Sequence, residues 1–139
     1  MMNDIRVARL FPFSVHPDVL RVRWEIYANL ERWDGALEIA GAIIKLDPGQ
    51  ADCWLYKASS LHSLNRNQDA HQTLLDALKR FPKDSAVLYD LACLCCMMER
   101  LKEAKGWLEK AIEAGGDKIK KRALDDPDFE MFWKKIGEL

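Results

Sequence analysis

Cys93 and Cys96 form a C-x-x-C spacing, which in other proteins performs redox chemistry or supplies half of a metal site. A redox site of this kind needs the motif at the start of a helix that follows a strand, where the helix dipole lowers the thiol pKa. Here the motif stands in the middle of a segment whose apolar residues recur every three or four positions, as in a helix. We therefore interpret both residues as small buried hydrophobic side chains.

A structural zinc site would need a second pair of ligands beside this motif. Cys53 and His62 are the nearest candidates in the sequence, but they belong to another predicted helix and have no metal-ligand spacing between them. The sequence therefore predicts no metal site and no cofactor.

The histidines and the paired glycines give no sign of catalysis. His16, His62 and His71 form no constellation with Ser or Asp that resembles a triad. Gly115 and Gly116 follow a predicted helix instead of opening one, so they do not make a phosphate-binding loop.

Three acidic residues near the C-terminus have a structural explanation as well. Asp125, Asp126 and Asp128 surround Pro127, where a helix is expected to begin. Carboxylates at that place cap the first turn and complement the helix dipole, which suits them better to starting a helix than to acid–base catalysis. With no other catalytic grouping in the sequence, we predict that the protein is not an enzyme.

Composition narrows the class of partner. The 139 residues carry a net charge of −1, which implies no field strong enough to hold nucleic acid or anionic lipid. The apolar runs are far shorter than the roughly 20 residues that a bilayer-spanning helix needs. Three of the four cysteines crowd into residues 93–96, a poor layout for a disulfide framework. We expect a cytoplasmic protein without nucleic-acid or membrane partners.

A repeat of 34 residues dominates the sequence. Alanine recurs at Ala36, Ala70 and Ala104, and the interval is 34 residues both times. Pro48 and Pro82 keep the same interval, and the next place in that series holds Gly116, which also ends helices. This period is typical of stacked helix pairs.

Within each period the large, small and aromatic residues follow one order. The middle unit matches best, with Trp54, Ala58, Leu61, Ala70, Leu74, Ala77 and Pro82. The third unit supplies Leu88, Leu91, Ala92, Cys95, Ala104, Leu108 and Ala111, and the first supplies Leu20, Tyr27, Ala36, Ile43 and Pro48. Over roughly residues 17–118 the chain thus resembles the tetratricopeptide-repeat (TPR) family.

The resemblance implies an all-α fold, a right-handed α-α superhelix (TPR solenoid) of three antiparallel helix pairs with a C-terminal cap. We expect three units, at 17–50, 51–84 and 85–118, after an N-terminal arm or short helix at 1–16. The capping helices would occupy 119–139, where Phe129, Phe132, Trp133 and Ile136 share one helical face. The six repeat helices are expected at 17–30, from the residue after the Asp34 cap to 46, at 51–64, at 68–80, at 85–98 with Ser85 as cap, and at 102–114.

The same resemblance implies that the first helices of the pairs line a concave groove that binds a peptide or protein segment. The chain would then act as an adaptor or scaffold. The groove candidates are Arg21, Val22, Glu25 and Asn29, then Leu55, Tyr56, Ser59 and His62, then Tyr89, Asp90, Cys93 and Met97. We expect Tyr56 and Tyr89 to be the main anchors, because a rigid aromatic ring contributes contact area at low entropic cost.

Other roles remain open for these residues and for the chain. Each groove candidate could instead pack between repeats or face water. The aromatic N- and C-terminal segments could serve self-assembly, as in a homodimer, instead of capping.

One TPR subtype binds the acidic C-terminal tails of heat-shock chaperones, which end in Glu-Glu-Val-Asp (EEVD), through a clamp of Lys, Asn and Arg. The matching positions here hold Arg21 and Glu25, then Tyr56, then Ala86 and Asp90. Only one of them is basic, and the two acidic residues would repel a carboxylate ligand. We expect no binding of EEVD-type tails.

Overall fold

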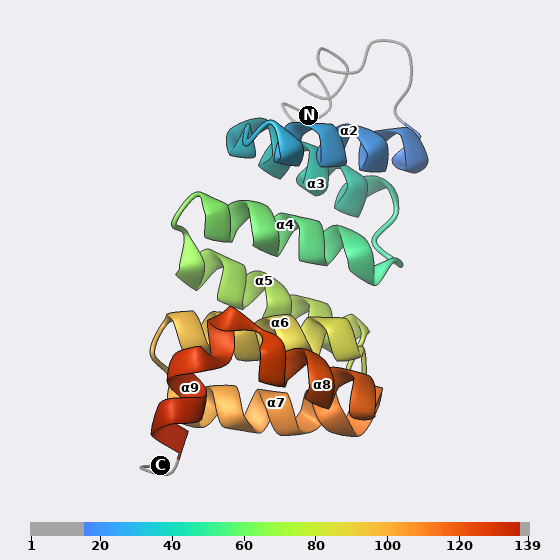
Figure 1. The fold of residues 1–139 in the computed structure, drawn as a ribbon. Coiled ribbons are helices and arrows are strands. Elements are labelled where there is room, and N and C mark those ends of the chain that lie inside the picture. Colours follow the sequence, from blue (N-terminus) through green and yellow to red (C-terminus); the bar gives the residue numbers. More distant parts are fainter. Residues whose placement is uncertain (1–15, 137–139) are drawn as a thin grey trace. The chain divides into compact units, whose positions relative to one another are not determined.

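Helices account for the regular structure of residues 16–136. The computed structural model describes residues 16–136, so the predicted arm at 1–16 lies outside the described residues except for His16. Residues 16–136 form helices and no strand, as predicted (Figure 1). None of the helices in this range has the length and apolar character required to cross a membrane.

The six predicted repeat helices are confirmed within a few residues. They are α2 (Pro17–Asn29), α3 (Trp33–Leu46), α4 (Ala51–Ser63), α5 (Asn67–Arg80), α6 (Ser85–Met97) and α7 (Leu101–Gly115). Three shorter elements follow, namely α8 (Asp117–Asp125), the 3-10 helix η1 (Pro127–Phe129) and α9 (Glu130–Lys135). We refer to residues 117–136 as the C-terminal segment.

Two of the predicted helix starts were wrong. The Asp84 side chain, not Ser85, caps α6 by accepting a hydrogen bond from the Val87 backbone N–H at 3.1 Å. Asp34 does not cap α3, because that helix already begins at Trp33. Asp34 lies instead in the first turn, where its carboxylate complements the helix dipole.

The turns inside the predicted pairs repeat the same backbone geometry. One residue in each turn has a positive φ, and these residues are again 34 apart: Glu31 at 56°, Asn65 at 61° and Glu99 at 61°. The arginine that follows donates its backbone N–H to a carbonyl five residues back, in the bonds Arg32 to Tyr27 (2.9 Å), Arg66 to Leu61 (2.8 Å) and Arg100 to Cys95 (2.8 Å). This bond closes a Schellman-type helix end. The period is therefore present in the backbone as well as in the side chains.

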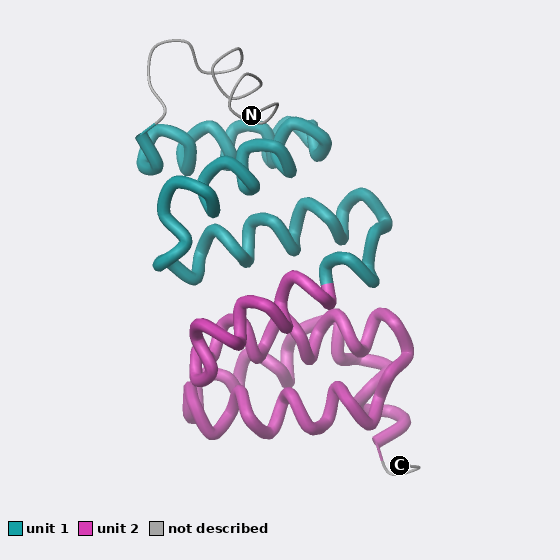
Figure 2. Tube along the Cα trace, turned by 180° about the vertical axis from the view of Figure 1, so that it is seen from behind, with its two compact units in different colours: residues 1–70 teal, residues 71–139 magenta. Residues whose placement is uncertain are grey.

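The chain forms two compact units, residues 1–70 and residues 71–139 (Figure 2). In the first unit α3 packs against both α2 and α4. Its core contains Leu20, Ile39, Ala42, Ile43 and Cys53, with Trp24, Tyr27, Ile44, Trp54 and Tyr56 packed against it.

The second unit is built on the pair α6 and α7, which pack along each other. The C-terminal segment completes its core, because α8 packs on α7 and η1 packs on α6. Phe129 and Phe132, expected on one apolar face, are both buried there together with Tyr89 and Leu108. The boundary between the compact units falls inside α5, so the division into three repeats stays a prediction.

Two glycines of α3 are expected to respond in opposite ways to alanine. A Cβ on Gly41 would meet nothing within 4 Å. Gly41→Ala should therefore raise the unfolding free energy by about 0.5–1 kcal/mol, because alanine lowers the backbone entropy of the unfolded chain. A Cβ on Gly35 would lie 2.5 Å from the Tyr27 ring, and Gly35→Ala should cost about 1–3 kcal/mol. Urea unfolding of the two variants measures both effects, and equal shifts in one direction would contradict this packing.

Candidate functional site

Arg21 of α2 is held by carboxylates and is not free for a ligand. Its Nε donates to Asp52 Oδ2 at 2.8 Å, and its Nη2 donates to Asp52 Oδ1 at 3.3 Å. This bidentate pair joins α2 to α4. Asp18 and Asp47 lie 3.3 and 3.6 Å from the same guanidinium. The hydrogen bond to Asp52 is the main reason why the pKa of Arg21 is raised. Because Arg21 is one cation among three carboxylates, the cluster of Arg21, Asp18, Asp47 and Asp52 has a net negative charge.

Tyr56 of α4 is locked in place by Trp24 of α2. The two rings stack with centroids 4.2 Å apart and an interplanar angle of 11°. Trp24 Nε1 donates to Ser60 Oγ at 3.0 Å, and the buried Ser60 hydroxyl donates to the Tyr56 carbonyl oxygen at 2.8 Å. Burial, and secondly the charge of Asp52, raise the pKa of the half-buried Tyr56 hydroxyl. Tyr56 is therefore a rigid aromatic platform.

The other predicted residues of the first unit vary in exposure. Glu25, Asn29 and Ser59 are exposed, whereas Leu55 is half-buried. His62, also half-buried, lies with Nδ1 2.7 Å from Asn67 Oδ1. We call the surface formed by Arg21, Glu25, Asn29, Tyr56 and Ser59 the α2–α4 face.

The structure places Tyr89, the second predicted anchor, in the core of the second unit. The residue is fully buried, and its hydroxyl donates to Asp126 Oδ2 at 2.6 Å. The Phe129 ring lies 5.4 Å from its centroid and the Arg122 guanidinium 4.2 Å from it. Burial and the bond to Asp126 raise its pKa. All three neighbours belong to the C-terminal segment, so that segment occupies the side of α6 on which Tyr89 was expected to meet a partner.

The remaining predicted residues of α6 follow the same pattern. Cys93 is buried, and its Sγ lies 3.9 Å from Asp126 Oδ2. Burial raises the pKa of Cys93 and, to about 12, that of Cys96. These shifts disfavour the thiolates that redox chemistry requires. Met97 at the end of α6 is 38% exposed.

Asp90 is half-buried, and burial is the first cause that raises its pKa, to about 6. Arg122 opposes the shift, whereas Asp126 and Asp84 add to it. Since the folded state holds the proton more tightly than the unfolded chain, stability should fall as the pH rises from about 4 to 6 and stay low above that. Asp90→Asn should add on the order of 1–2 kcal/mol at pH 7 and flatten this slope. Thermal unfolding from pH 4 to 8 tests this, with the exposed Glu113→Gln as control, and an unchanged slope in the Asp90 variant would contradict it.

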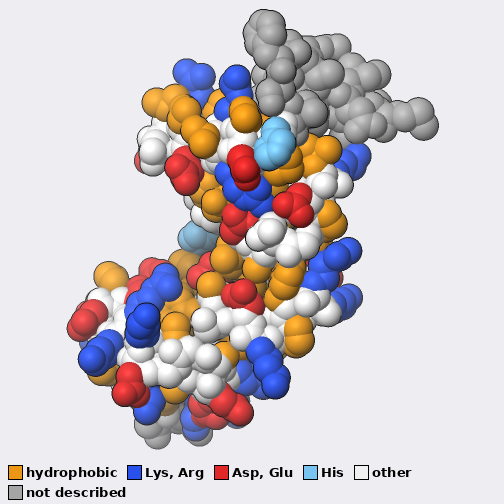
Figure 3. Space-filling model, turned by 90° about the vertical axis from the view of Figure 1, so that its right-hand side faces the viewer, with side chains coloured by type: hydrophobic (Ala, Val, Ile, Leu, Met, Phe, Trp, Pro, Cys, Tyr) orange, Lys and Arg blue, Asp and Glu red, His pale blue; other side chains and the backbone are white. Residues whose placement is uncertain are grey.

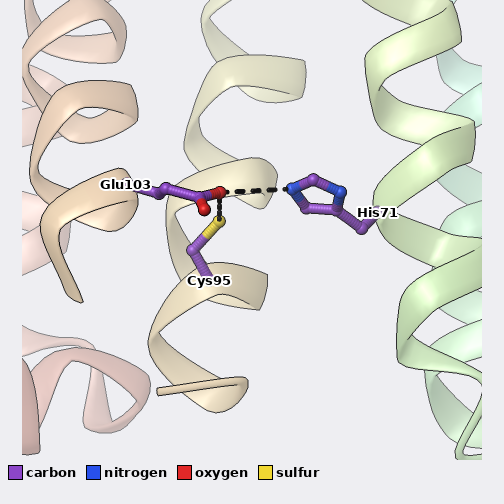
Figure 4. Close-up of side chains that lie close together, drawn as sticks. All are labelled: His71, Cys95 and Glu103. Carbon is purple, nitrogen blue, oxygen red and sulfur yellow. Dashed lines mark hydrogen bonds and ion pairs between the residues drawn. The ribbon is translucent and has the colours of Figure 1, made fainter. Parts of the chain in front are cut away.

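His71, Cys95 and Glu103 form a cluster that sequence reasoning missed. They come from α5, α6 and α7, and their side chains converge within the second unit (Figure 4). His71 Nε2 lies 3.8 Å and Cys95 Sγ 3.9 Å from Glu103 Oε2. No spacing motif joins residues on three different helices, so the sequence carries no direct signal of this cluster.

An apolar stripe runs along one side of α2. Its members are three or four residues apart, and each is more than one-third exposed: Val19, Val22, Ile26 and Leu30. Only Val22 was among the predicted groove residues. In contrast to this stripe, charged side chains of both signs are interspersed over the face displayed in Figure 3, without a large area of one sign.

Family models and solved structures agree with this fold. Two models described as tetratricopeptide repeat match residues 30–87 and 63–118. None of the curated proteins matches the sequence.

Among solved structures, a complex of the TPR2B domain of yeast Sti1 with pHsp70 is similar at a TM-score of 0.75 and 16% identity, covering 91% of this chain and all (100%) of that one. The Sgt2 TPR domain from Aspergillus fumigatus is similar at a TM-score of 0.73 and 21% identity, and the match covers 88% of this chain and 80% of that one. A third similar structure is the Yersinia enterocolitica type III secretion chaperone SycD in complex with a peptide of the translocator YopD. Its TM-score is 0.66 at 14% identity, and the match covers 87% of this chain and 86% of that one. At these identities the likeness concerns the fold. With two family models spanning residues 30–118 and TPR domains among the structures of like fold, the chain belongs to the tetratricopeptide-repeat family.

Proposed function

We propose that this protein is a non-catalytic interaction module that binds a peptide or protein segment in the TPR groove, with the α2–α4 face as the part of it that contacts the partner. The observation that carries this proposal is the fixed orientation of Tyr56, which stacks on Trp24, while Ser60 accepts a hydrogen bond from Trp24 and donates one to the Tyr56 carbonyl. Glu25 and Asn29 on α2 and Ser59 on α4 are exposed. A preordered ring on helices that also carry exposed polar side chains suits recognition of a peptide. Two of the similar structures, those of Sti1 and SycD, are complexes with a peptide or protein partner, which supports this class of function.

The charge of the face narrows the chemistry of the partner. Asp18, Asp47 and Asp52 outnumber the single Arg21 that they surround, and Glu25 adds an exposed carboxylate. Because like charges in contact cost binding energy, we expect the face to prefer basic or neutral segments over acidic ones. A titration with a peptide ending in Glu-Glu-Val-Asp should show no binding, and low-micromolar affinity would refute this part of the proposal.

The groove proposal can be tested with exposed residues, whose substitution spares the core. Glu25→Lys and Ser59→Arg change the α2–α4 face, whereas Glu113→Lys changes the exposed surface of α7 and serves as control. Partners are captured by cross-linking in an extract of the source cell and identified by mass spectrometry. We expect a partner whose capture falls at least about tenfold with each face variant and persists with the control, because a few central residues carry most of the binding energy. A partner set unchanged by both face variants would move the binding site elsewhere.

Self-assembly is the second candidate, and the α2 stripe favours it. Val22 and Leu30 are each 57% exposed, and a continuous apolar side of a helix is a common contact surface between copies of a chain. Light scattering over a range of concentrations discriminates the two functions. A dimer that Val22→Glu dissociates would support self-assembly through α2, and a strict monomer at high concentration would end this alternative.

A further inference from the structure

The His71–Cys95–Glu103 cluster is the strongest feature that the proposed function does not use. The three ligand atoms, His71 Nε2, Cys95 Sγ and a Glu103 carboxylate oxygen, all lie within 4.8 Å of one another (Figure 4). They belong to three helices of one compact unit. The groups differ in kind, being an imidazole, a thiol and a carboxylate, and Glu103 Oε2 lies within 4 Å of both of the others.

His71 gives an independent reason to look for a ligand. Its side chain is only 8% exposed, and among residues 16–136 neither ring nitrogen has a hydrogen-bond partner. Leaving both nitrogens of a buried imidazole without partners costs free energy that a packed apolar residue would not cost. Nε2 is directed at Glu103 Oε2 at 3.8 Å, which is too long for a hydrogen bond. The separation is instead close to the one expected between two ligand atoms of the same metal ion.

The geometry points to a first-row divalent transition ion, with Zn²⁺ as the reference, bound by His71 Nε2, Cys95 Sγ and a Glu103 carboxylate oxygen. Zinc bonds of roughly 2.0–2.3 Å at a tetrahedral angle place ligand atoms about 3.3–3.7 Å apart. The observed 3.8 and 3.9 Å separations need only a small contraction. A set of S, N and O donors suits Zn²⁺ and its neighbours, whereas Ca²⁺ and Mg²⁺ take oxygen ligands.

The charges around the cluster are compatible with this ion. A thiolate and a carboxylate together neutralise a divalent charge, which offsets the cost of burying it. Burial, and secondly the charge of Arg100, lower the pKa of His71, whereas Glu103 raises it. Burial raises the pKa of Cys95 to about 11, and Arg100 opposes that rise. The two Arg100 contributions act in the same direction. Both effects favour the deprotonated forms that bind metal. Binding should therefore release a proton from Cys95 and weaken as the pH falls.

The site has an open side. Glu103 is 54% exposed, and an open surface depression of about 370 Å³ is lined by Glu99, Arg100, Leu101, Lys102 and Glu103. Of the three ligands, Glu103 is the one that lines this depression, so the proposed ion would be reached from the Glu103 side, with water in the fourth coordination position. Three protein ligands with one open position tie α5 to the pair α6 and α7 without closing the site.

A second group, Cys93, Asp126 and Asp128, serves as an internal comparison. Asp126 already accepts hydrogen bonds from the Tyr89 hydroxyl at 2.6 Å and from the Asp128 backbone N–H at 2.9 Å. Asp128 is exposed, and neither carboxylate of this group has a buried oxygen that lacks a partner among the described residues. We therefore assign the ion to the His71 cluster and use Cys93 as a control.

The test is a Zn²⁺ titration of the full chain, reduced with a phosphine and stripped of metal, in competition with a chromophoric chelator. We expect one equivalent bound, and Glu103→Gln should weaken the affinity at least about tenfold. Glu103 is exposed, so this variant should fold even if His71 or Cys95 variants do not. The matched control is Glu109→Gln, an exposed glutamate on the same helix, which should leave the affinity unchanged. No stoichiometric binding, or equal affinity in the two variants, would overturn the assignment.

A titration with Co²⁺ identifies the sulfur ligand. Thiolate coordination gives a charge-transfer band in the near ultraviolet that nitrogen and oxygen ligands do not give. The band should be present in the parent protein and in Cys93→Ser and absent from Cys95→Ser. A band that survives in Cys95→Ser but disappears in Cys93→Ser would place the ion in the other group and refute the proposal.

Discussion

Replacing Phe129 with alanine is expected to lower the unfolding free energy by about 3–5 kcal/mol, the range for truncating a fully buried aromatic residue. The ring is 0% exposed and lies against Tyr89, Phe132 and Trp133, with centroid separations of 5.4, 5.8 and 6.4 Å. Urea unfolding followed by circular dichroism measures the loss. Met131→Ala in the same segment, where the side chain is 53% exposed, should cost less than about 0.5 kcal/mol.

The same variant reports on Tyr89. If the C-terminal segment holds this residue buried, Phe129→Ala should make the tyrosine accessible to iodide quenching or nitration under conditions where α6 and α7 stay helical. A variant as stable as the parent, or one in which Tyr89 stays protected, would contradict the packing of the second unit.

Trp24→Ala should be the second most damaging of these changes, with a loss of about 2–4 kcal/mol, less than for a fully buried tryptophan because Trp24 is half-buried. The substitution removes the stack with Tyr56, which is worth about 0.5–1.5 kcal/mol beyond area burial. The substitution also removes the Trp24 indole N–H, from which the buried Ser60 hydroxyl now accepts a hydrogen bond.

Trp24→Phe separates the two parts of this effect. Phenylalanine keeps a ring opposite Tyr56 but has no N–H, so it should recover part of the stability and leave the Ser60 oxygen without its donor. Equal losses for the alanine and phenylalanine variants would mean that the stack contributes nothing. In binding assays Trp24→Ala should also weaken partners of the α2–α4 face, because Tyr56 would lose its fixed orientation.

The sequence was most informative about the positions of the helices, because these depend on interactions between residues close together in the chain. Apolar residues three and four apart, with Pro48 and Pro82 closing the pairs, were enough to place α2 to α7 within a few residues. Helix starts were less predictable, as Asp84 and Ser85 show. Both are good capping residues, and the choice depends on backbone angles that neighbouring identities do not determine.

The candidate site depended on contacts between distant residues and was therefore harder to predict. The repeat register put Tyr89 on the first helix of its pair, at the position that Leu55 holds in the preceding unit. The burial of Tyr89, however, depends on Asp126, which lies 37 positions away. Periodicity places the aromatic residues of the C-terminal segment on one face and does not say which helix that face covers. The His71, Cys95 and Glu103 cluster was missed for a similar reason, because three helices converge there only through packing.

The turns at Glu31, Asn65 and Glu99 bear on how this chain can be rebuilt. Since the backbone closes in the same way at all three places, a stretch cut at one turn and spliced in at another meets ends of matching geometry. Duplication or deletion of a whole 34-residue cassette would then preserve every junction, whereas an insertion of any other length would put one turn out of phase. Lengthening this protein by whole cassettes is consequently a more conservative change than adding a single residue to α4.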